Sequence, residues 1–209
     1  MKMIKTHVYI DGFNLYYLAL KKSSYKWLDL KSLLQKLLSK DHSIQSIKYF
    51  TARVSGKLDP QQPNRQNTYI RALEAYIPEV SVHYGQFLSH EIWAPLAVPK
   101  DKNRFVKIIK TEEKGSDVNL AVHLLNDAWL NKFDCAVIVS NDGDLSEALK
   151  IVKNHHKKII GVINPGSLFA STELRKYANF IKRIRKNVLS VSQLPNPIPG
   201  TRIHKPDSW

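Results

Sequence analysis

The sequence predicts an α/β fold of three layers, α/β/α, with a mainly parallel sheet of about five to six strands. Short segments rich in β-forming residues alternate with amphipathic helical segments, which is typical of a parallel sheet covered on both faces. The run "CAVIVS", residues 135–140, is apolar almost throughout, as expected for a central parallel strand. With 209 residues, 43% of them hydrophobic, the chain is large enough for the core of one domain.

The first half of the chain starts with the strand "HVYI", residues 7–10. Asp29 is a typical N-cap residue, and the leucines that follow at helical spacing predict a helix over 30–40. The alternation then continues with a strand over 46–54, a helix over 65–76 that ends before Pro78, and a strand over 79–88.

Residues 90–114 contain two prolines and a charged middle, which predicts a hairpin-like excursion or an irregular flap. A helix is expected over 116–130, and its broad apolar face is predicted to contain Val118, Ala121, Leu125, Ala128 and Trp129. The expected elements after it are a strand over 135–140, a helix over 144–155, a strand over 157–164, a short helix over 171–177 and an edge strand over 179–184.

The end of the chain differs in composition from the rest. Its last 17 residues, "QLPNPIPGTRIHKPDSW", contain four prolines and show no periodicity. We therefore expect an extended, proline-rich C-terminal tail over 186–209, after a single domain over 1–185.

The chain is strongly basic, because 32 Lys and Arg residues against 18 Asp and Glu residues give a net charge of +14. Much of the excess lies in residues 147–209, which contain 12 basic and 3 acidic residues. Two clusters, "HHKK" at 155–158 and "KRIRK" at 182–186, stand out. Each cluster alone is compatible with a solvated surface, but the charge of the whole chain favours a nucleic acid partner. The backbone contacts are then expected from Lys157, Lys158, Arg183 and Arg185.

Cys135 is the only cysteine, so the chain has no internal disulfide, and its apolar neighbours predict a buried thiol. No run reaches the roughly 18 apolar residues that cross a bilayer. The apolar stretch near the N-terminus is too short for a signal peptide. These observations predict a cytoplasmic protein without a membrane partner, and they leave a homodimer open.

Acidic residues follow two of the expected strands and begin one of the expected helices. Asp11 ends the first strand, Asp142 and Asp144 follow the strand 135–140, and Asp117 lies in the first turn of a helix. Each residue alone also fits a turn or cap role. In a parallel sheet, however, ligands bind at the C-terminal ends of the strands, where these acids would meet. Carboxylates that repel each other favour a bound cation, and an all-oxygen site suits Mg²⁺ or Mn²⁺.

Three motifs, "YIDGFNL", "KGSDVNLA" and "VSNDGDL", resemble in order and spacing the NYN domains of the PIN-like nuclease superfamily, over roughly residues 4–184. The resemblance implies a compact α/β/α domain that hydrolyses RNA phosphodiester bonds with Mg²⁺ or Mn²⁺. It implies that the metal-binding and catalytic acids are Asp11, Asp117, Asp142 and Asp144, with Asn14 and Ser140 as polar supports. Lys114, beside Asp117, is a candidate partner for a phosphate oxygen.

The sequence departs from the family at His123, near which many members have a further acid. Asp127 does not replace that acid, since it lies about 15 Å along the helix from Asp117 and roughly 80° around it. For His123 itself, a surface or packing role and a contact with substrate or a second metal both stay open. The expected partner is RNA, with a single strand as one possible form, and DNA stays open because no residue can be assigned to the 2′-hydroxyl.

Two further functions stay in view, and the departure at His123 favours the first of them. One is a non-catalytic RNA-binding or regulatory module whose metal site has decayed. The other is the activity of an NYN subgroup whose members bear names as pyridine-ring monooxygenases. The sequence contains no pattern that indicates a flavin, a haem or a site of two histidines and one carboxylate.

Overall fold

The computed structural model describes residues 3–56, 59–100, 103–166 and 169–209, which form an α/β domain on a seven-stranded sheet. The strand order is β4-β3-β2-β1-β5-β6-β7, and only β3 and β4 pair antiparallel. The strands are β1 (Ile4–Asp11), β2 (His42–Ala52), β3 (Val80–Lys100), β4 (Asn103–Lys114), β5 (Cys135–Val139), β6 (Ile159–Asn164) and β7 (Phe180–Arg183). The sheet is one strand larger than expected, because the predicted flap supplies β4.

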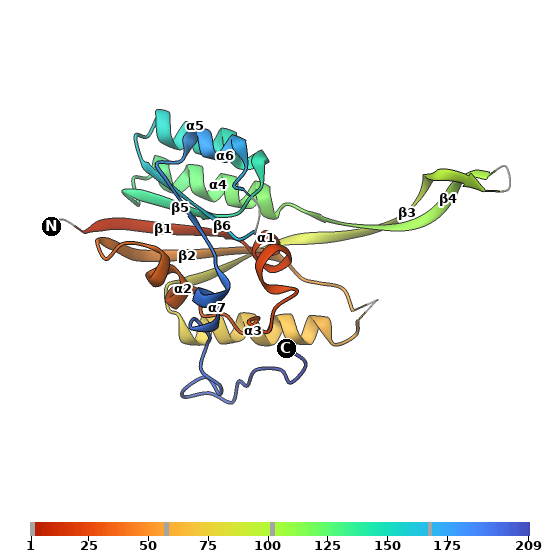
Figure 1. Ribbon diagram of the computed structural model, residues 1–209, viewed down its shortest axis with the longest axis horizontal. Helices are drawn as coiled ribbons and strands as arrows, with labels where there is room; N and C mark the ends of the chain where they lie inside the picture. The colour runs from red at the N-terminus through yellow and green to blue at the C-terminus, as the bar shows by residue number, and fades with distance from the viewer. Residues whose placement is uncertain (1–2, 57–58, 101–102, 167–168) are drawn as a thin grey trace.

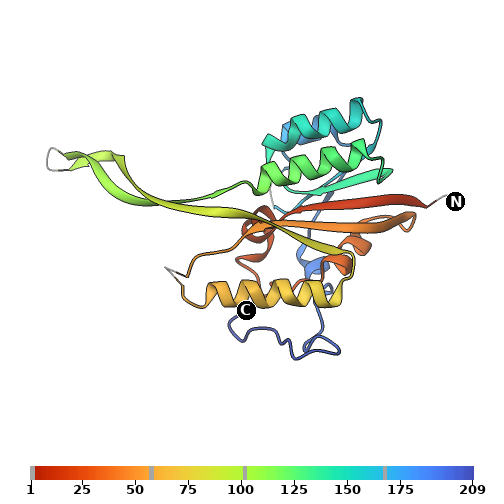
Figure 2. The same ribbon diagram turned by 180° about the vertical axis from the view of Figure 1, so that it is seen from behind.

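Helices cover both faces of the sheet, which confirms the three-layer α/β/α prediction. Figures 1 and 2 show α4, α5 and α6 on one face and α2, α3 and α7 on the other. The helices and helical turns are α1 (Gly12–Leu15), η1 (Tyr16–Leu20), α2 (Leu30–Leu37), α3 (Gln62–Tyr76), α4 (Ser116–Trp129), η2 (Gly143–Leu145), α5 (Ser146–Asn154), α6 (Thr172–Tyr177) and α7 (Lys186–Ser190).

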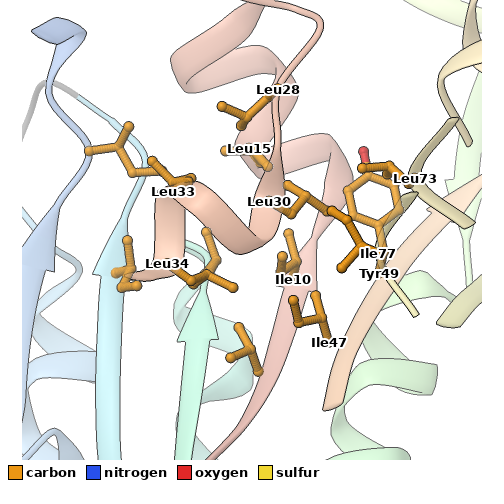
Figure 3. Packing of buried hydrophobic residues seen from close by; sticks show 14 of the residues in the cluster. Ile10, Leu15, Leu28, Leu30, Leu33, Leu34, Ile47, Tyr49, Leu73 and Ile77 are labelled. Atoms are coloured by element: carbon orange, nitrogen blue, oxygen red, sulfur yellow. The ribbon is translucent and has the colours of Figure 1, made fainter. Parts of the chain in front are cut away.

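The larger core lies between the sheet and helices α2 and α3 (Figure 3). Helix α2 starts as the sequence predicts, since the carboxylate of Asp29 accepts a hydrogen bond from the backbone N–H of Ser32 at 2.9 Å. Leu30, Leu33 and Leu34 then pack in one cluster with Ile10 of β1 and Ile47 of β2, and all five side chains are fully or almost fully buried.

The second core lies between the sheet and helices α4, α5 and α6, and here one prediction was wrong. The buried apolar residues of α4 are Leu120, Leu124 and Ala128, spaced four apart. Val118 and Trp129, which we expected on the apolar face, are 65% and 78% exposed. Helix α4 carries apolar side chains on more than one face, so periodicity alone does not select the face that meets β1, β2 and β3.

The segment expected as a hairpin-like excursion or flap is a regular antiparallel ribbon that projects from the body (Figures 1 and 2). Strands β3 and β4 pair from Gln86 opposite Lys114 outward to Pro95 opposite Phe105, and the register shifts between Pro95 and Lys100. Prolines are tolerated on strands with a free edge, and both strands of a two-stranded ribbon have one. Pro95 is accommodated in this way, opposite Phe105.

The C-terminal segment has little regular structure after α7, as its prolines predict, yet it packs onto the body. Leu189, Leu194 and Ile198 belong to the larger core. The indole N–H of Trp27 donates a hydrogen bond to the carbonyl of Pro195 at 3.1 Å. The last residue, Trp209, lies with its ring 5.5 Å from the ring of Tyr69 and 6.3 Å from that of Trp27, centroid to centroid.

None of the helices in the described ranges combines the length and apolar character that a bilayer span requires.

Candidate active site

The two central strands bring Asp11 and Ser140 together at their C-terminal ends. Strands β1 and β5 are parallel neighbours in register, with Ile10 opposite Val139, so the next residue of each chain segment lies at the same edge. Asp11 and Ser140 are both buried. The hydroxyl of Ser140 donates a hydrogen bond to Oδ2 of Asp11 at 3.0 Å. The same hydroxyl oxygen accepts a hydrogen bond from the backbone N–H of Asp142 at 3.0 Å.

The second oxygen of Asp11 holds the start of α1. Oδ1 accepts a hydrogen bond from the backbone N–H of Asn14 at 2.9 Å, so Asp11 is also the cap that its position suggested. The side chain of Asn14 then reaches across to the β5 loop, where its Oδ1 accepts from the N–H of Asn141 at 3.0 Å. Asn14 therefore links the start of α1 directly to the loop after β5.

Asn141 was missed by the sequence reasoning, although it lies within the motif "VSNDGDL". Its Oδ1 accepts a hydrogen bond from the backbone N–H of Ser171, just before α6, at 2.7 Å. It therefore connects the β5 loop to a third segment of the chain. An asparagine next to a predicted site acid was the available signal, since Asn side chains stabilise turns by bonding to nearby backbone.

Asp142 and Asp144 lie on the turn after β5. Oδ1 of Asp142 accepts from the backbone N–H of Asp144 at 3.0 Å and caps the short helix η2. Asp142 is half-buried and Asp144 is exposed. Asp142 and Asp144 therefore form the turn that the sequence suggested, and the same two residues follow the C-terminal end of β5.

Asp117 lies in the first turn of α4 and is half-buried. Gly115 adopts a left-handed conformation with φ of 91°, which turns the chain from β4 into the helix. The carboxylate of Glu113 accepts a hydrogen bond from the N–H of Ser116 at 3.0 Å. Strand β3 passes close by at Gly85, where a Cβ atom would lie 2.6 Å from the carbonyl oxygen of Lys114. Glu113 is a second residue that the sequence reasoning did not assign.

The electrostatics of Asp117 and Asp11 show that these carboxylates sense one another. Burial raises the pKa of Asp117 to about 6, and the negative charges of Asp11, Asp142, Glu113 and Asp144 act in the same direction. Burial also raises the pKa of Asp11, and Asp142 adds to that increase, whereas the hydrogen bonds from Asn14 and Ser140 oppose it. The site therefore holds negative charge at a free-energy cost that a cation would reduce.

The donor chemistry of the site fits Mg²⁺ or Mn²⁺, which prefer carboxylate oxygens. Among the residues that the structure describes, no three His, Cys, Asp or Glu side chains are grouped closely enough to hold a metal ion as they lie. Mg²⁺ is commonly held by one or two carboxylates together with water and substrate phosphates, an arrangement that needs no such cage. The hydroxyl of Ser116, beside Asp117, is buried and has no hydrogen-bond partner among the described residues.

Asp127 lies away from the site, as helix geometry predicted, in a buried polar cluster. Its carboxylate accepts hydrogen bonds from the hydroxyl of Tyr9 at 2.8 Å, from Lys48 and from Lys132 at 3.2 Å. Burial acts to raise the pKa of Asp127, but the hydrogen bonds from Lys48 and Tyr9 outweigh it and lower the pKa to about 2. Asp127 is therefore a structural anion.

His123 packs against two rings above the sheet. Its ring centroid lies 4.2 Å from that of His83 and 5.6 Å from that of Phe50. Burial lowers the pKa of His123, and the positive charge of Lys48 lowers it further. Of the two roles left open for His123, these contacts correspond to packing.

The structure separates the predicted basic residues into two groups. Arg183 ends β7 and Arg185 follows it. Both are exposed at the C-terminal ends of the parallel strands, where Asp11 also lies. Lys114, also exposed, forms an ion pair with Glu112 at 3.6 Å. Lys157 and Lys158 precede β6 and therefore lie at the N-terminal ends of the parallel strands. The rise of a six-residue strand separates these ends from the C-terminal ends by about 20 Å. The structure does not bring these two lysines to the carboxylates.

Comparisons with known proteins agree with this architecture. The family model for the NYN domain matches residues 5–184. A curated relative from Pseudomonas putida, the 6-hydroxy-3-succinoylpyridine 3-monooxygenase HspA, is 33% identical over 99% of this chain and 75% of its own length. A crystal structure of a protein of unknown function from Vibrio parahaemolyticus has the same fold, with a TM-score of 0.56 and 18% identity over 88% of this chain and 95% of that one. The chain therefore belongs to the NYN domain family, a family of PIN-like nucleases.

Proposed function

We propose that this chain is a metal-dependent ribonuclease that hydrolyses RNA phosphodiester bonds with the help of Mg²⁺ or Mn²⁺. The observation that carries the proposal is the buried carboxylate of Asp11, held by Ser140 at the end of β1 and electrostatically coupled to Asp117. A buried acid, together with further acids on two other segments, provides the carboxylate ligands of a cation site. The NYN family membership supplies the reaction class.

The proposed roles follow from burial and hydrogen bonding. Asp11 and Asp142 bind the ion, while Asp117 and Asp144 bind it directly or through water, or orient the attacking water. Ser140 and Asn14 hold the two loops so that these carboxylates keep their positions. When bound, a divalent ion supplies charge stabilisation at the scissile phosphate and a lowered pKa for water.

The substrate in this proposal is a single RNA strand that crosses the C-terminal edge of the sheet. Arg183, Arg185 and Lys114 are exposed on the site's side of the molecule and would contact phosphates without reading sequence. Lys157 and Lys158 lie at the N-terminal ends of the β-strands, so only a long RNA strand that continues around the molecule would contact them.

The test is cleavage of labelled single-stranded and structured RNA by purified protein with Mg²⁺, Mn²⁺ or EDTA. The comparison is an Asp11→Asn/Asp142→Asn double variant, which keeps the size of both side chains and removes both charges. The matched control is Asp134→Asn, because Asp134 is an exposed acid at the opposite edge of the sheet, where it accepts a hydrogen bond from the N–H of Lys5.

Metal-dependent cleavage that the double variant loses and the control keeps supports the proposal. Cleavage that persists in EDTA or in the double variant would refute the assigned site. Tight RNA binding without cleavage in any metal would instead favour the non-catalytic RNA-binding module.

A second candidate function comes from the curated relative, whose name describes hydroxylation of a pyridine ring. Its 33% identity extends over 99% of this chain, so the two proteins share more than the three acidic motifs. A monooxygenase inserts one atom of O₂ into its substrate and reduces the other to water with two electrons from a donor. Incubation with 6-hydroxy-3-succinoylpyridine, O₂ and NADH, with and without FAD, tests this function. The name places the new oxygen on C3, the ring carbon that carries the succinoyl group, so its insertion must release that group. Formation of a dihydroxypyridine and a free four-carbon acid, both absent from the heat-treated control, would establish this function.

A further inference from the structure

A cavity of about 390 Å³ opens near the C-terminal ends of β1 and β2, next to Asp11. Gly12 at the start of α1, Thr51 near the end of β2, Arg65 in the first half of α3 and the terminal Trp209 all line it. Its volume lies in the range of pockets that hold small ligands, about 300–1,000 Å³. The cavity is therefore a second concave feature that adjoins the carboxylates.

Tyr49 connects this cavity to the carboxylate site. Its side chain lines the cavity, and a Cβ atom on Gly12 would lie 2.8 Å from its hydroxyl oxygen. Gly12, which also lines the cavity, follows Asp11 directly in the chain. A ligand in the cavity would therefore have Asp11 close to one end.

Aromatic rings surround the cavity on the side of α1 and η1. The rings of Phe13 and Tyr17 are stacked at 6.4 Å between centroids with an interplanar angle of 24°. Tyr16 meets Tyr17 edge-on at 5.4 Å. Tyr17 is 53% exposed, so part of its side chain is open to a partner. Such aromatic side chains are the groups on which planar rings stack in proteins.

Positive charge accompanies these rings. The ammonium group of Lys21 lies 4.7 Å from the ring centroid of Tyr17, and Lys26 also lines the cavity. Neither lysine forms an ion pair with any carboxylate of the described residues, whereas Arg65 is paired with Asp59. The cavity therefore combines a stacking surface with lysine charge that is available to an anion.

We propose that this cavity binds a planar aromatic ring that carries an anionic group, with the ring against Tyr17 and the anion near Lys21. Two sources share this chemistry, a nucleotide of a polynucleotide strand and a free aromatic carboxylate. For the nucleotide, the inference deepens the proposed ribonuclease function and rests on it, because a base in the cavity would place the adjoining phosphate near Asp11.

The test is calorimetric titration of the intact wild-type protein with AMP, adenosine and nicotinate, none of which contains a phosphodiester to cleave. AMP is expected to bind with a Kd of about 1 mM or below, and adenosine about five-fold more weakly. Tyr17→Ala is expected to weaken AMP binding by about ten-fold, while Tyr17→Phe retains it. Lys21→Ala is expected to weaken AMP and leave adenosine unchanged. The matched control is Tyr76→Ala, an exposed tyrosine at the end of α3 that does not line the cavity.

The outcomes distinguish a nucleotide from a free aromatic carboxylate as the ligand, and they test the cavity and the ribonuclease proposal separately. Tighter binding of AMP than of nicotinate, with the Tyr17→Ala loss, assigns the cavity to a nucleotide, and the reverse order assigns it to a free carboxylate. Binding of neither ligand, or equal losses in Tyr17→Ala and Tyr76→Ala, would overturn the inference. RNA cleavage by wild type without binding of either AMP or nicotinate refutes the cavity alone, whereas AMP binding without cleavage refutes the ribonuclease proposal and leaves the cavity in place.

Discussion

The hydroxyl of Ser140 donates a hydrogen bond to Oδ2 of Asp11 at 3.0 Å, and both residues are buried where two parallel strands end. Through this bond β5 sets the orientation of a carboxylate that belongs to β1. Because the same hydroxyl accepts from the N–H of Asp142, one serine positions two of the proposed ion-binding residues.

Ser140→Ala is therefore expected to lower ribonuclease activity and Mn²⁺ affinity by about 10–100-fold, the range seen when groups that orient metal ligands are removed. Its cost in unfolding free energy should be about 2 kcal/mol, since two hydrogen bonds of about 1 kcal/mol each are lost. Activity assays and Mn²⁺ titrations measure the first effect, and urea unfolding measures the second. Ser190→Ala, which removes an exposed hydroxyl on α7, is the control. An unchanged Mn²⁺ affinity in Ser140→Ala would contradict the assigned role.

Asp117→Asn is expected to raise the Tm of the metal-free protein at pH 7.5. The pKa of Asp117 is raised from 3.8 to about 6, so the folded state binds its proton more tightly than the unfolded state does. Stability from this group is present below about pH 4 and is lost as the pH rises through 6. The variant has no charge at this position and therefore avoids that loss of stability. A gain of about 1 kcal/mol in the free energy of unfolding corresponds to a rise of about 2–4 °C in Tm.

Thermal unfolding of wild type and Asp117→Asn in EDTA, between pH 4 and 8, checks this prediction. With Mn²⁺ the order should change, because the ion stabilises the wild type by binding to its folded state. A variant that melts below wild type in EDTA at pH 7.5 would show that the Asp117 charge is not repelled in the free protein.

Asp127→Asn is expected to destabilise the fold without removing the Mn²⁺ response. The substitution leaves Lys48 and Lys132 without their anion, and breaking a buried ion pair costs about 3–5 kcal/mol. The pKa of Asp127 is lowered to about 2, so its stabilising contribution is present above about pH 4 and is lost as the pH falls toward 2. Urea unfolding should therefore show a gap between wild type and variant at pH 7 that narrows toward pH 2. Loss of the Mn²⁺-induced rise in Tm in a folded Asp127→Asn protein would place Asp127 in the site after all.

Arg183→Ala/Arg185→Ala is expected to weaken RNA binding and to reduce the slope of log K against log salt by about 1–2, since each lost phosphate contact removes close to one unit. Lys157→Ala/Lys158→Ala changes the net charge equally but lies at the opposite edge of the sheet. With a short single-stranded RNA, this second variant should leave the slope almost unchanged. Fluorescence anisotropy at several salt concentrations gives both slopes. Equal slopes for the two variants would mean that the RNA does not follow the site's edge.

Ile198→Ala is expected to lower the free energy of unfolding by about 2–4 kcal/mol, because Ile198 is fully buried in the larger core. Val191→Ala, in the same segment but 62% exposed, should change it by less than about 0.5 kcal/mol. Urea unfolding of both variants provides the comparison. A similar, small effect for the two would show that residues after α7 do not contribute to the core in solution.

Much of the fold was predictable because its signals are local. The strand 135–140 is apolar almost throughout, and Asp29 caps the helix that it was expected to cap. The regular ribbon of β3 and β4 was predicted only as a flap, because its strand character depends on pairing that the two prolines obscured. The buried face of α4 was wrong for a related reason, since several of its faces are apolar and contact with the sheet chose one of them.

The sequence by itself determined the strand and helix order, and it placed Asp11, Asp142 and Asp144 at the C-terminal ends of strands, because a residue that follows a parallel strand emerges there. The metal-binding role of these acids and of Asp117 stays a prediction. The sequence also excluded Asp127 from the site, since helix geometry sets how far ten residues extend. Only the tertiary structure decided which strands are neighbours, and thereby that Ser140 orients Asp11, that Lys157 and Lys158 lie at the far edge, and that Trp209 returns to a cavity beside Gly12. These relationships join residues far apart in the chain, and no local pattern encodes a contact whose two partners are brought together by packing of the whole sheet.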